Sequence, residues 1–253
     1  MRLSRLYIDI PLSVGQEIVL PKESAHYLLN VLRLRVGTSI TLFNGEGGEY
    51  IAHLITATKK MAQLQIIEYK EIERESFLQL TLVQAISRPE HINYTLQKSV
   101  ELGVQHIVPV IAERSPPFDK NKISKREQHW QKIIISACEQ SGRNRLPHLH
   151  NIQPLTNWLN KPQQGIRIVL SPNGKKFLSH NIFPLSQRET KGNSITVLIG
   201  AEGGLTENEI QQATKTGYLD IRLGARILRT ETAAVTMLAI CQALWGDLHS
   251  ENP

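Results

Sequence analysis

One loop decides how the fold of this chain is interpreted: Leu198-Ile199-Gly200-Ala201-Glu202-Gly203-Gly204-Leu205. It follows the apolar run Ser194–Ile199, which predicts a strand, and leads into Thr206 with Glu209 three residues later, the pattern of a helix capping box. Glycines here let a backbone turn sharply and approach a ligand without a Cβ in the way. The loop lacks both the G-x-G-x-x-G dinucleotide pattern and the Lys-Ser/Thr of a P-loop. Taken alone, it is explained better as an ordinary turn than as a binding loop.

A second glycine marks the end of the next predicted strand, in Leu223-Gly224-Ala225-Arg226-Ile227-Leu228-Arg229-Thr230-Glu231-Thr232-Ala233. Thr230 as an N-cap and Glu231 as a first-turn acid would be ordinary features of a helix start. Arg229 has no such explanation, because a cation at a helix N-terminus is disfavoured by about 0.3–1 kcal/mol. A misplaced charge beside a glycine-rich loop indicates a functional site, although the pattern alone leaves both interpretations open.

From Leu78 onward, predicted strands and helices alternate. Apolar runs predict strands at Leu78–Ile86, His106–Ile111, Ile166–Leu170, Ser194–Ile199 and Leu219–Leu223. The helices expected are His91–Leu102, one capped by Ser124 and Glu127 that ends at Gly142, one from Thr206 to Gly217, and Thr230–Trp245. Such alternation predicts an α/β fold, a mostly parallel sheet covered on both faces. Ligands of these sheets usually bind at the carboxyl ends of the strands.

The first 70 residues are β-rich instead. The expected strands are Arg5–Ile10, Gln16–Leu20, Ser39–Phe43, Tyr50–Thr58 and Met61–Tyr69, with one helix at Glu23–Arg33. The charged run Lys70–Ser76 cannot bury itself, so a domain boundary is expected there. We therefore expect two domains, residues 1–72 and residues 73–253.

Composition narrows the class of protein. The 253 residues carry 29 Lys and Arg against 23 Asp and Glu, a formal charge of +6, so a polyanionic partner is plausible without being required. No apolar run is long enough for a membrane span, and the N-terminus lacks the apolar stretch of a signal peptide. Two cysteines, Cys138 and Cys241, cannot form a disulfide framework or a four-thiolate zinc site, and this fits a reducing cytoplasm.

Both glycine stretches, together with other motifs in the same order, resemble the ribosomal small-subunit methyltransferase E family of the SPOUT class of methyltransferases. The further motifs are Val31-Leu32-Arg33, Lys98-Ser99-Val100-Glu101-Leu102-Gly103, Glu113-Arg114-Ser115 and Ala137-Cys138-Glu139-Gln140-Ser141-Gly142-Arg143. The resemblance covers nearly the whole chain. The family commonly has proline where Ala201 and Ala225 stand, which loosens the loops slightly without removing a chemical group.

The resemblance implies a small PUA-like RNA-binding β-barrel followed by a SPOUT trefoil-knotted α/β methyltransferase domain. It further implies a homodimer that uses S-adenosylmethionine to methylate N3 of one uridine in small-subunit ribosomal RNA, with no metal and no membrane. The expected cofactor-binding residues are Leu170, Leu198, Ile199, Gly200, Glu202, Gly203, Gly204, Leu223, Gly224, Ile227, Leu228 and Thr232.

Two residues are expected to serve the reaction itself. The N3 of uracil carries a proton, so its lone pair is a poor nucleophile until that proton leaves. Arg229 is expected to stabilise the anionic base, since one electrostatic donor of this kind is worth roughly 10²–10³ in rate. Glu231 is a candidate base, although a first-turn acid is the stronger interpretation.

RNA contacts should follow the arginines, because guanidinium groups bind phosphate bidentately. The expected RNA-binding residues are Arg5, Arg33, Arg35, Arg114, Arg143 and Arg145. Two alternatives stay open: a non-catalytic RNA-binding or ribosome-assembly factor, and a SPOUT enzyme that methylates a different RNA atom.

Overall fold

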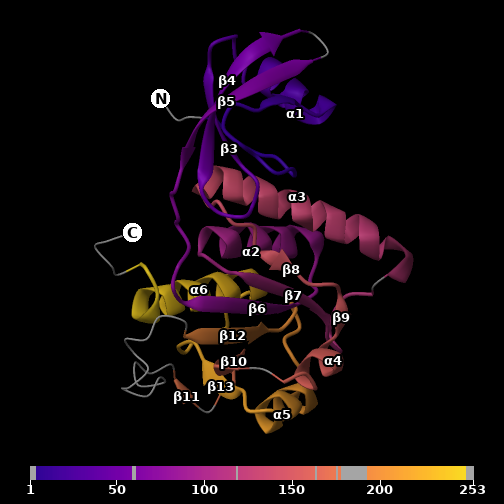
Figure 1. The fold of residues 1–253 in the computed structure, drawn as a ribbon. Coiled ribbons are helices and arrows are strands. Elements are labelled where there is room, and N and C mark those ends of the chain that lie inside the picture. The colour runs from indigo at the N-terminus through magenta and orange to yellow at the C-terminus, as the bar shows by residue number, and fades with distance from the viewer. Residues whose placement is uncertain are drawn as a thin grey trace. The chain divides into compact units, whose positions relative to one another are not determined.

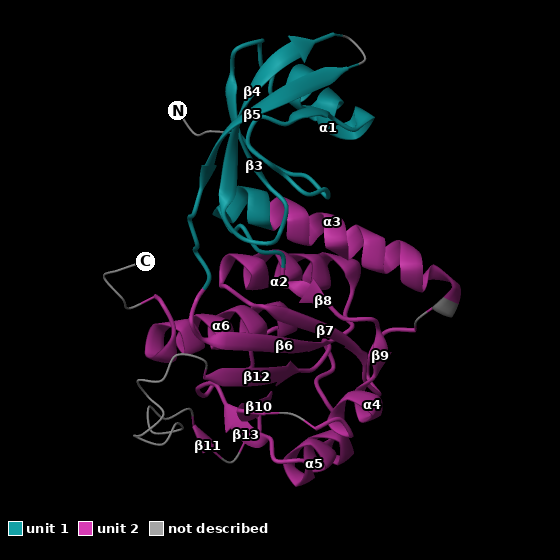
Figure 2. Cartoon of the chain, in the orientation of Figure 1, with its two compact units in different colours: residues 1–75, 138–146 teal, residues 76–137, 147–253 magenta. Residues whose placement is uncertain are grey.

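The chain forms two compact units. The computed structural model describes residues 4–58, 61–117, 119–162, 164–174, 176–177 and 193–248. Unit 1 comprises residues 1–75 and 138–146, and unit 2 comprises residues 76–137 and 147–253 (Figure 2). The two units divide the chain next to the charged run Lys70–Ser76, and unit 1 takes in a second segment from the middle of the chain.

Unit 1 is built on a five-stranded sheet with the order β1-β3-β4-β5-β2 (Figure 1). The strands are β1 (Ser4–Tyr7), β2 (Glu17–Val19), β3 (Ser39–Phe43), β4 (Glu49–Ala57) and β5 (Ala62–Lys70). β1 pairs with β3 in parallel and the other pairs are antiparallel. Alternate side chains from these strands, among them Leu42, Leu54 and Leu64, are buried in one apolar core.

The helix expected at Glu23–Arg33 is shorter and changes type. It consists of α1 (Lys22–His26) and the π-helical turn η1 (Tyr27–Val31). Ala25 and Leu28 are buried in the core of unit 1, and Arg33 follows with φ +55°, a left-handed backbone conformation. A left-handed residue ends the helical segment, and the local pattern of apolar residues does not reveal it.

Unit 2 contains an all-parallel sheet with the order β11-β13-β10-β12-β6-β7-β8, and β9 also pairs with β7 (Figure 1). The strands are β6 (Gln79–Ala85), β7 (His106–Ile111), β8 (His148–Leu149), β9 (Gln153–Pro154), β10 (Ile166–Leu170), β11 (Lys176–Phe177), β12 (Ser194–Ile199) and β13 (Leu219–Arg222). The mostly parallel sheet expected from the sequence is confirmed.

Helices cover both faces of this sheet. They are α2 (Pro89–Glu101), α3 (Ile123–Ser141) after the short η2 (Lys120–Lys122), α4 (Leu155–Leu159), α5 (Glu207–Lys215) and α6 (Thr230–Trp245). Val83 and Leu198 share an apolar cluster with residues of α4 and α5. Their chain neighbours Leu82 and Val197 point to the opposite face, are fully buried, and lie on the side of α2 and α6, which pack on each other.

Of the three helix caps predicted from the sequence, one forms and two do not. The capping box of Thr206 and Glu209 is confirmed, with both reciprocal hydrogen bonds formed. Ser124, however, lies inside α3, which begins at Ile123 directly after η2. Thr230 is the first residue of α6 and not its cap; Arg229 takes the N-cap position and makes no side-chain capping bond. The Thr230 hydroxyl donates instead to the carbonyl of Gly200, as described below. Within the described residues, no helix is long and apolar enough to span a membrane.

Candidate functional site

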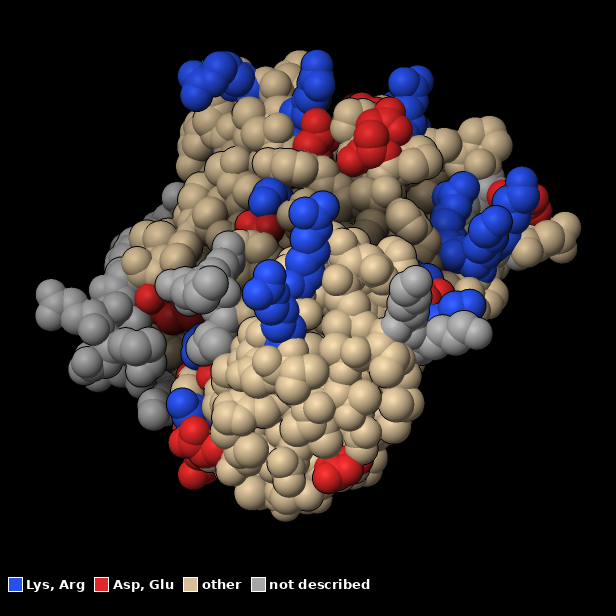
Figure 3. Space-filling model, turned by 90° about the horizontal axis from the view of Figure 1, so that it is seen from above, with Lys and Arg blue, Asp and Glu red and all other residues tan. Residues whose placement is uncertain are grey.

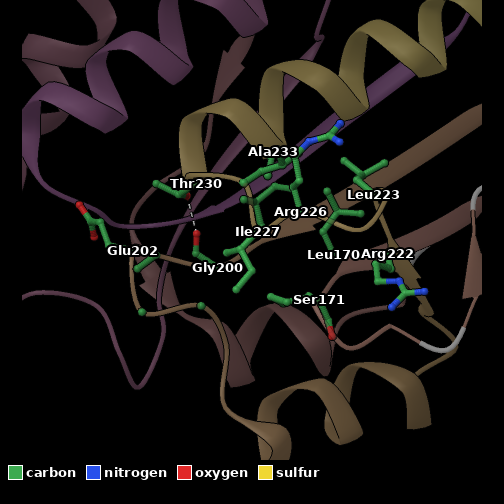
Figure 4. Close-up of a pocket in the computed structure, with 16 residues that line it drawn as sticks. Leu170, Ser171, Gly200, Glu202, Arg222, Leu223, Arg226, Ile227, Thr230 and Ala233 are labelled. Carbon is green, nitrogen blue, oxygen red and sulfur yellow. Dashed lines mark hydrogen bonds between the residues drawn. The ribbon is translucent and has the colours of Figure 1, made fainter.

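A pocket lies where three neighbouring strands of unit 2 end. β13, β10 and β12 are adjacent and parallel, so their carboxyl ends, and the loops that follow, meet at one edge of the sheet. The pocket has an empty volume of about 780 Å³, which includes space open to solvent. Figure 4 shows its lining side chains converging from these loops and from the start of α6.

Nine of the twelve expected cofactor-binding residues line this pocket: Leu170, Ile199, Gly200, Glu202, Gly203, Gly204, Leu223, Ile227 and Leu228. Three do not. Leu198 is fully buried in the core between the sheet and the helices α4 and α5, while Gly224 and Thr232 are exposed. The structure therefore brings nine of these residues together at one pocket, and their contact with a cofactor stays a prediction.

Seven further residues line the pocket: Ser171, Pro172, Ala201, Arg222, Arg226, Thr230 and Ala233. Ser171 and Pro172 could have been predicted from the sequence, because they directly follow β10 and ligands usually bind at the carboxyl ends of parallel strands. The walls are largely apolar, and Ile227 stands at the open side with 83% of its surface exposed. Such a pocket suits a flat apolar group held against a few polar backbone and hydroxyl groups.

The glycine loop folds back on itself. The Gly204 N–H donates to the Ala201 carbonyl at 2.9 Å, and Gly204 has φ +71°, a conformation that favours glycine. A Cβ on Gly200 would lie 2.7 Å from the Gly204 carbonyl carbon. Gly200 and Gly204 are therefore needed for the turn itself, one for close approach and the other for its left-handed backbone.

A buried hydrogen-bond network ties this loop to the start of α6. The Thr230 hydroxyl donates to the Gly200 carbonyl at 2.6 Å (Figure 4). The Gln84 side-chain amide, 1% exposed at the end of β6, donates to the Thr230 hydroxyl at 3.1 Å and to the Gly200 carbonyl at 3.3 Å. Three segments distant in sequence are thus fixed at one point of the pocket wall.

The Glu202 carboxylate is held outside the pocket. In Figure 4 it points away from the other side chains drawn. Its Oε1 accepts from the Arg88 backbone N–H at 2.7 Å, at the start of α2, and lies 4.0 Å from the His91 Nε2. Glu202 therefore contributes its backbone to the lining, while its charge serves to anchor the loop.

The two expected catalytic residues lie beside the pocket and do not line it. Arg229 is exposed, between Leu228 and Thr230, which both line the pocket. Glu231 is 13% exposed in its side chain, and its Oε2 lies 3.2 Å from the Nδ1 of His91 on α2. No local pattern marks His91, because its proximity to Glu231 depends on how α2 packs against α6.

Two of the expected RNA-binding arginines are internal to unit 1. Arg5 donates to Glu49 at 2.6 Å and to the Asn144 side chain at 2.6 Å, and Arg143 is buried in an ion pair with Glu75. Burial disfavours ionisation of Glu49, but hydrogen bonds from Arg5 and Arg74 outweigh it and hold the Glu49 pKa below its usual 4.5. These guanidinium groups bind carboxylates of the protein itself, so they are not available to bind an RNA phosphate.

The other four arginines are exposed to different degrees. Arg33 and Arg35 are exposed in the segment after η1. Arg145 pairs with Glu73 at 2.6 Å yet keeps 53% of its side-chain surface exposed. Arg114 belongs to unit 2, and its guanidinium reaches the glycine loop. Among the described residues on the face drawn in Figure 3, Lys and Arg side chains stand in several separate places.

No metal centre is found in the part of the chain that the structure describes, where no group of three or more His, Cys, Asp or Glu side chains is arranged to hold an ion. Both cysteines are free and buried, and burial raises the pKa of each thiol to about 12. Neither Cys138 nor Cys241 is thus a reactive thiolate near neutral pH.

Comparison with known proteins agrees with this architecture. A family model for an RNA methyltransferase domain matches residues 74–242, which carry the pocket, and a model for an RNA methyltransferase PUA domain matches residues 20–67. The fold and site thus define an RNA methyltransferase of the α/β class with a PUA domain. More specifically, the chain belongs to the ribosomal RNA small subunit methyltransferase E family.

Family membership is based on near full-length similarity. Ribosomal RNA small subunit methyltransferase E of Buchnera aphidicola subsp. Schizaphis graminum is 34% identical over 250 residues, 98% of either chain. The crystal structure of that enzyme from Neisseria gonorrhoeae, bound to S-adenosylmethionine, is 40% identical with a TM-score of 0.87, over 98% of this chain and 100% of the other. A methyltransferase of Legionella pneumophila in complex with S-adenosylmethionine is 37% identical with a TM-score of 0.90, over the same shares.

Proposed function

We propose that this protein is an S-adenosylmethionine-dependent methyltransferase that methylates N3 of one uridine in small-subunit ribosomal RNA. The single observation that carries the proposal is the pocket of the glycine loop. It lies at the carboxyl ends of parallel strands, in a member of a family whose relatives are crystallised with this cofactor. The proposal for N3 as the target atom follows the family resemblance.

The pocket residues fit the proposed cofactor. Leu170, Ile199, Leu223 and Ile227 offer apolar surface for the adenine ring, and Ser171 also lines the pocket. The two loops that carry Gly204 and Gly224 have backbone without side chains at these points, with open space where each Cβ would lie. When bound, the cofactor supplies an electrophilic methyl group on a sulfonium. The protein's part is to hold that methyl in line with the attacking nitrogen.

For the reaction, we propose Arg229 as the group that stabilises the uracil anion. Arg229 is exposed and stands between two pocket-lining residues, Leu228 and Thr230. Glu231 does not line the pocket, and its Oε2 lies 3.2 Å from the His91 Nδ1 without a hydrogen bond within the described residues, so we assign it the role of a first-turn acid of α6. The proton on N3 must then pass to solvent or to a group of the RNA complex.

Arg229→Ala tests this assignment. Loss of the guanidinium should lower turnover by about 10²-fold, because one preorganised donor to a developing anion is worth that much. Cofactor affinity and the thermal midpoint should change little, since the side chain is exposed. Unchanged turnover would remove Arg229 from the mechanism, and Lys215→Ala, which removes an exposed cation of α5, serves as the control.

RNA is proposed to bind through residues 1–72, with residues 73–253 as the methyltransferase domain. Arg33 and Arg35 are the proposed phosphate contacts, with Arg145 as a further one, because their guanidinium groups reach solvent. A PUA-like barrel for the first domain and a trefoil knot at the C-terminal end of the second remain part of the proposal. The knot is proposed from the family resemblance.

A homodimer in the cytoplasm completes the proposal. α6 is apolar around its whole circumference, with Val235, Ala239 and Leu244 only partly buried within one chain. A helix that is apolar on all sides is normally buried, so a second copy of this chain is the proposed occupant of the uncovered side. Activity should then fall on dilution below the dimer dissociation constant.

The test of the proposed function is methyl transfer from labelled S-adenosylmethionine to small ribosomal subunits, with the modified nucleoside identified by mass. N3-methyluridine at one site is the expected result. Cofactor binding without incorporation would favour a different RNA substrate, and another methylated nucleoside would place the target on a different atom. No cofactor binding would favour a non-catalytic RNA-binding or assembly factor.

A further inference from the structure

Arg114 lies on the turn that follows β7, and its side chain extends to the glycine loop. Its Nη1 donates to the Gly203 carbonyl at 2.7 Å and, at a longer 3.4 Å, to the Leu205 carbonyl. One charged donor thus binds two backbone carbonyls of the segment that forms the pocket wall. Charge-assisted hydrogen bonds of this kind are about twice as strong as neutral ones.

The stem of Arg114 explains the glycine at 203. Gly203 does not have a positive φ, so its backbone does not by itself require glycine. A Cβ at this position would lie 3.3 Å from both the Cβ and the Cδ of Arg114, tighter than ordinary van der Waals contact. Glycine at 203 therefore leaves room for the arginine stem to cross the loop.

A second tie joins the same two segments. The Glu113 backbone N–H donates to Glu209 Oε1 at 2.8 Å, while Glu209 Oε2 accepts from the Thr206 N–H at 2.8 Å. Glu209 is 8% exposed, so its carboxylate is held away from solvent by these bonds. The turn after β7 and the segment 200–206 are thus fastened at two places, by Arg114 and by Glu209.

We propose that Arg114 is a positioning residue for the cofactor pocket, and that it does not contact RNA phosphate. It draws the Gly203 and Leu205 carbonyls toward the turn after β7, and this fixes the orientation of the peptide units between Gly200 and Leu205 that line the pocket. The inference rests on the proposed function, since it assumes that this pocket binds S-adenosylmethionine. It adds a residue outside the pocket lining that determines how well the cofactor is held.

Calorimetric binding of S-adenosylmethionine in the absence of RNA separates the two roles of Arg114. Arg114→Ala should weaken cofactor binding by about tenfold. Once the charged hydrogen bonds are lost, the loop is less ordered in the free protein, and the free energy needed to order it lowers the binding affinity. Arg114→Lys should be intermediate, since a lysine keeps one donor but not the planar fork. Lys125→Ala, which removes an exposed cation from α3 in the same unit, is the matched control and should leave the affinity unchanged.

Gly203→Ala tests the same contact from the other side. The added methyl group must displace the Arg114 stem, so this variant should weaken cofactor binding in the same direction. In the double variant, the two effects should not add, because one contact has been lost twice. Full additivity would contradict the proposed contact.

A second readout does not depend on the cofactor. Amide hydrogen exchange of the Gly204 N–H, which bonds to the Ala201 carbonyl, should become faster in Arg114→Ala than in the wild type. If the wild type binds no S-adenosylmethionine, the proposed function fails. The exchange rate still tests whether the hydrogen bonds of Arg114 to the Gly203 and Leu205 carbonyls order the loop. Unchanged exchange, or unchanged cofactor affinity together with weaker RNA binding and a smaller salt dependence, would overturn the role assigned to Arg114.

Discussion

Gly204 is a residue whose function lies in its backbone. Its φ is +71°, and no heavy atom lies within 4 Å of the place where a Cβ would stand. A Cβ here would therefore meet no atom of the protein, but it would strain the turn that the Gly204 N–H closes on Ala201. A glycine in a binding loop is thus required for conformation, and open space beside it remains for a ligand.

Gly204→Ala should weaken S-adenosylmethionine binding several-fold, because a left-handed alanine costs about 1–2 kcal/mol and the turn can relieve that cost by opening. Calorimetry measures the affinity. The control is Gly37→Ala in unit 1, which has φ +87° and an equally open Cβ position, so it carries the same strain away from the pocket. Equal cofactor affinity in the two variants would contradict the role given to the Gly204 turn.

Arginine positions show how far residue type can predict contacts. Arg5 and Arg33 are indistinguishable as candidates in the sequence, yet one bonds to Glu49 and Asn144 and the other is exposed. The difference arises because Asn144 comes from a segment more than a hundred residues away. Residue type therefore predicted a binding chemistry, and only the long-range packing decided which arginines were available for it.

At the scale of elements, prediction succeeded where the signal is local. The strands His106–Ile111, Ile166–Leu170 and Ser194–Ile199 have the bounds expected from their apolar runs, and the Thr206 capping box forms as expected. Thr230 was expected to cap α6 by the same logic, but its hydroxyl bonds to Gly200. Capping by sequence pattern fails there because a distant carbonyl competes for the same hydroxyl.

Pairing of β7 with β8 brings three histidines together at one side of the sheet. His106 and His148 are register partners, and the His150 Nε2 lies 3.3 Å from the His106 Nδ1. Burial, and then the charges of His148, His106 and Lys161, lower the His150 pKa from 6.5 to about 4. The folded protein therefore keeps His150 neutral at a pH where an unfolded chain would protonate it.

Unit 2 should consequently lose stability as the pH falls from about 6.5 to about 4. Above 6.5 neither state binds the proton, and within this window the unfolded state binds it while the folded state does not, so unfolding is favoured. Thermal midpoints of the wild type should fall by a few degrees between pH 7 and pH 5, and those of His150→Gln should fall less. His26→Gln, which removes an exposed histidine of α1, should follow the wild type. Identical pH dependence in His150→Gln would contradict the assignment.

At the scale of the whole molecule, unit 1 is discontinuous in sequence. Residues 138–146 belong to it, and within them Cys138, Arg143 and Asn144 are buried. The Asn144 side chain also donates to the Ile72 carbonyl at 2.8 Å. Composition and charge indicated the boundary near residue 72, but no local pattern assigns the end of α3 to the first unit, because that assignment depends on tertiary contacts. Deletion of the first 70 residues would remove Arg5, which donates to the Asn144 side chain and to the Arg143 carbonyl, together with the strands of this unit, so it is a poor test of RNA binding.

Substitution of exposed arginines tests RNA binding in the intact molecule. Arg33→Gln combined with Arg35→Gln should weaken binding to small-subunit ribosomal RNA and reduce the slope of log affinity against log salt by about 1.4, since each phosphate contact on a single strand contributes about 0.7. Cofactor affinity should be unchanged, because both residues lie in unit 1 and the pocket is formed by unit 2. Lys215→Gln in α5 should leave the slope at the wild-type value. An unchanged slope in the double variant would show that the phosphates are neutralised by other residues, and the half-exposed Arg145 would then be the next arginine to replace.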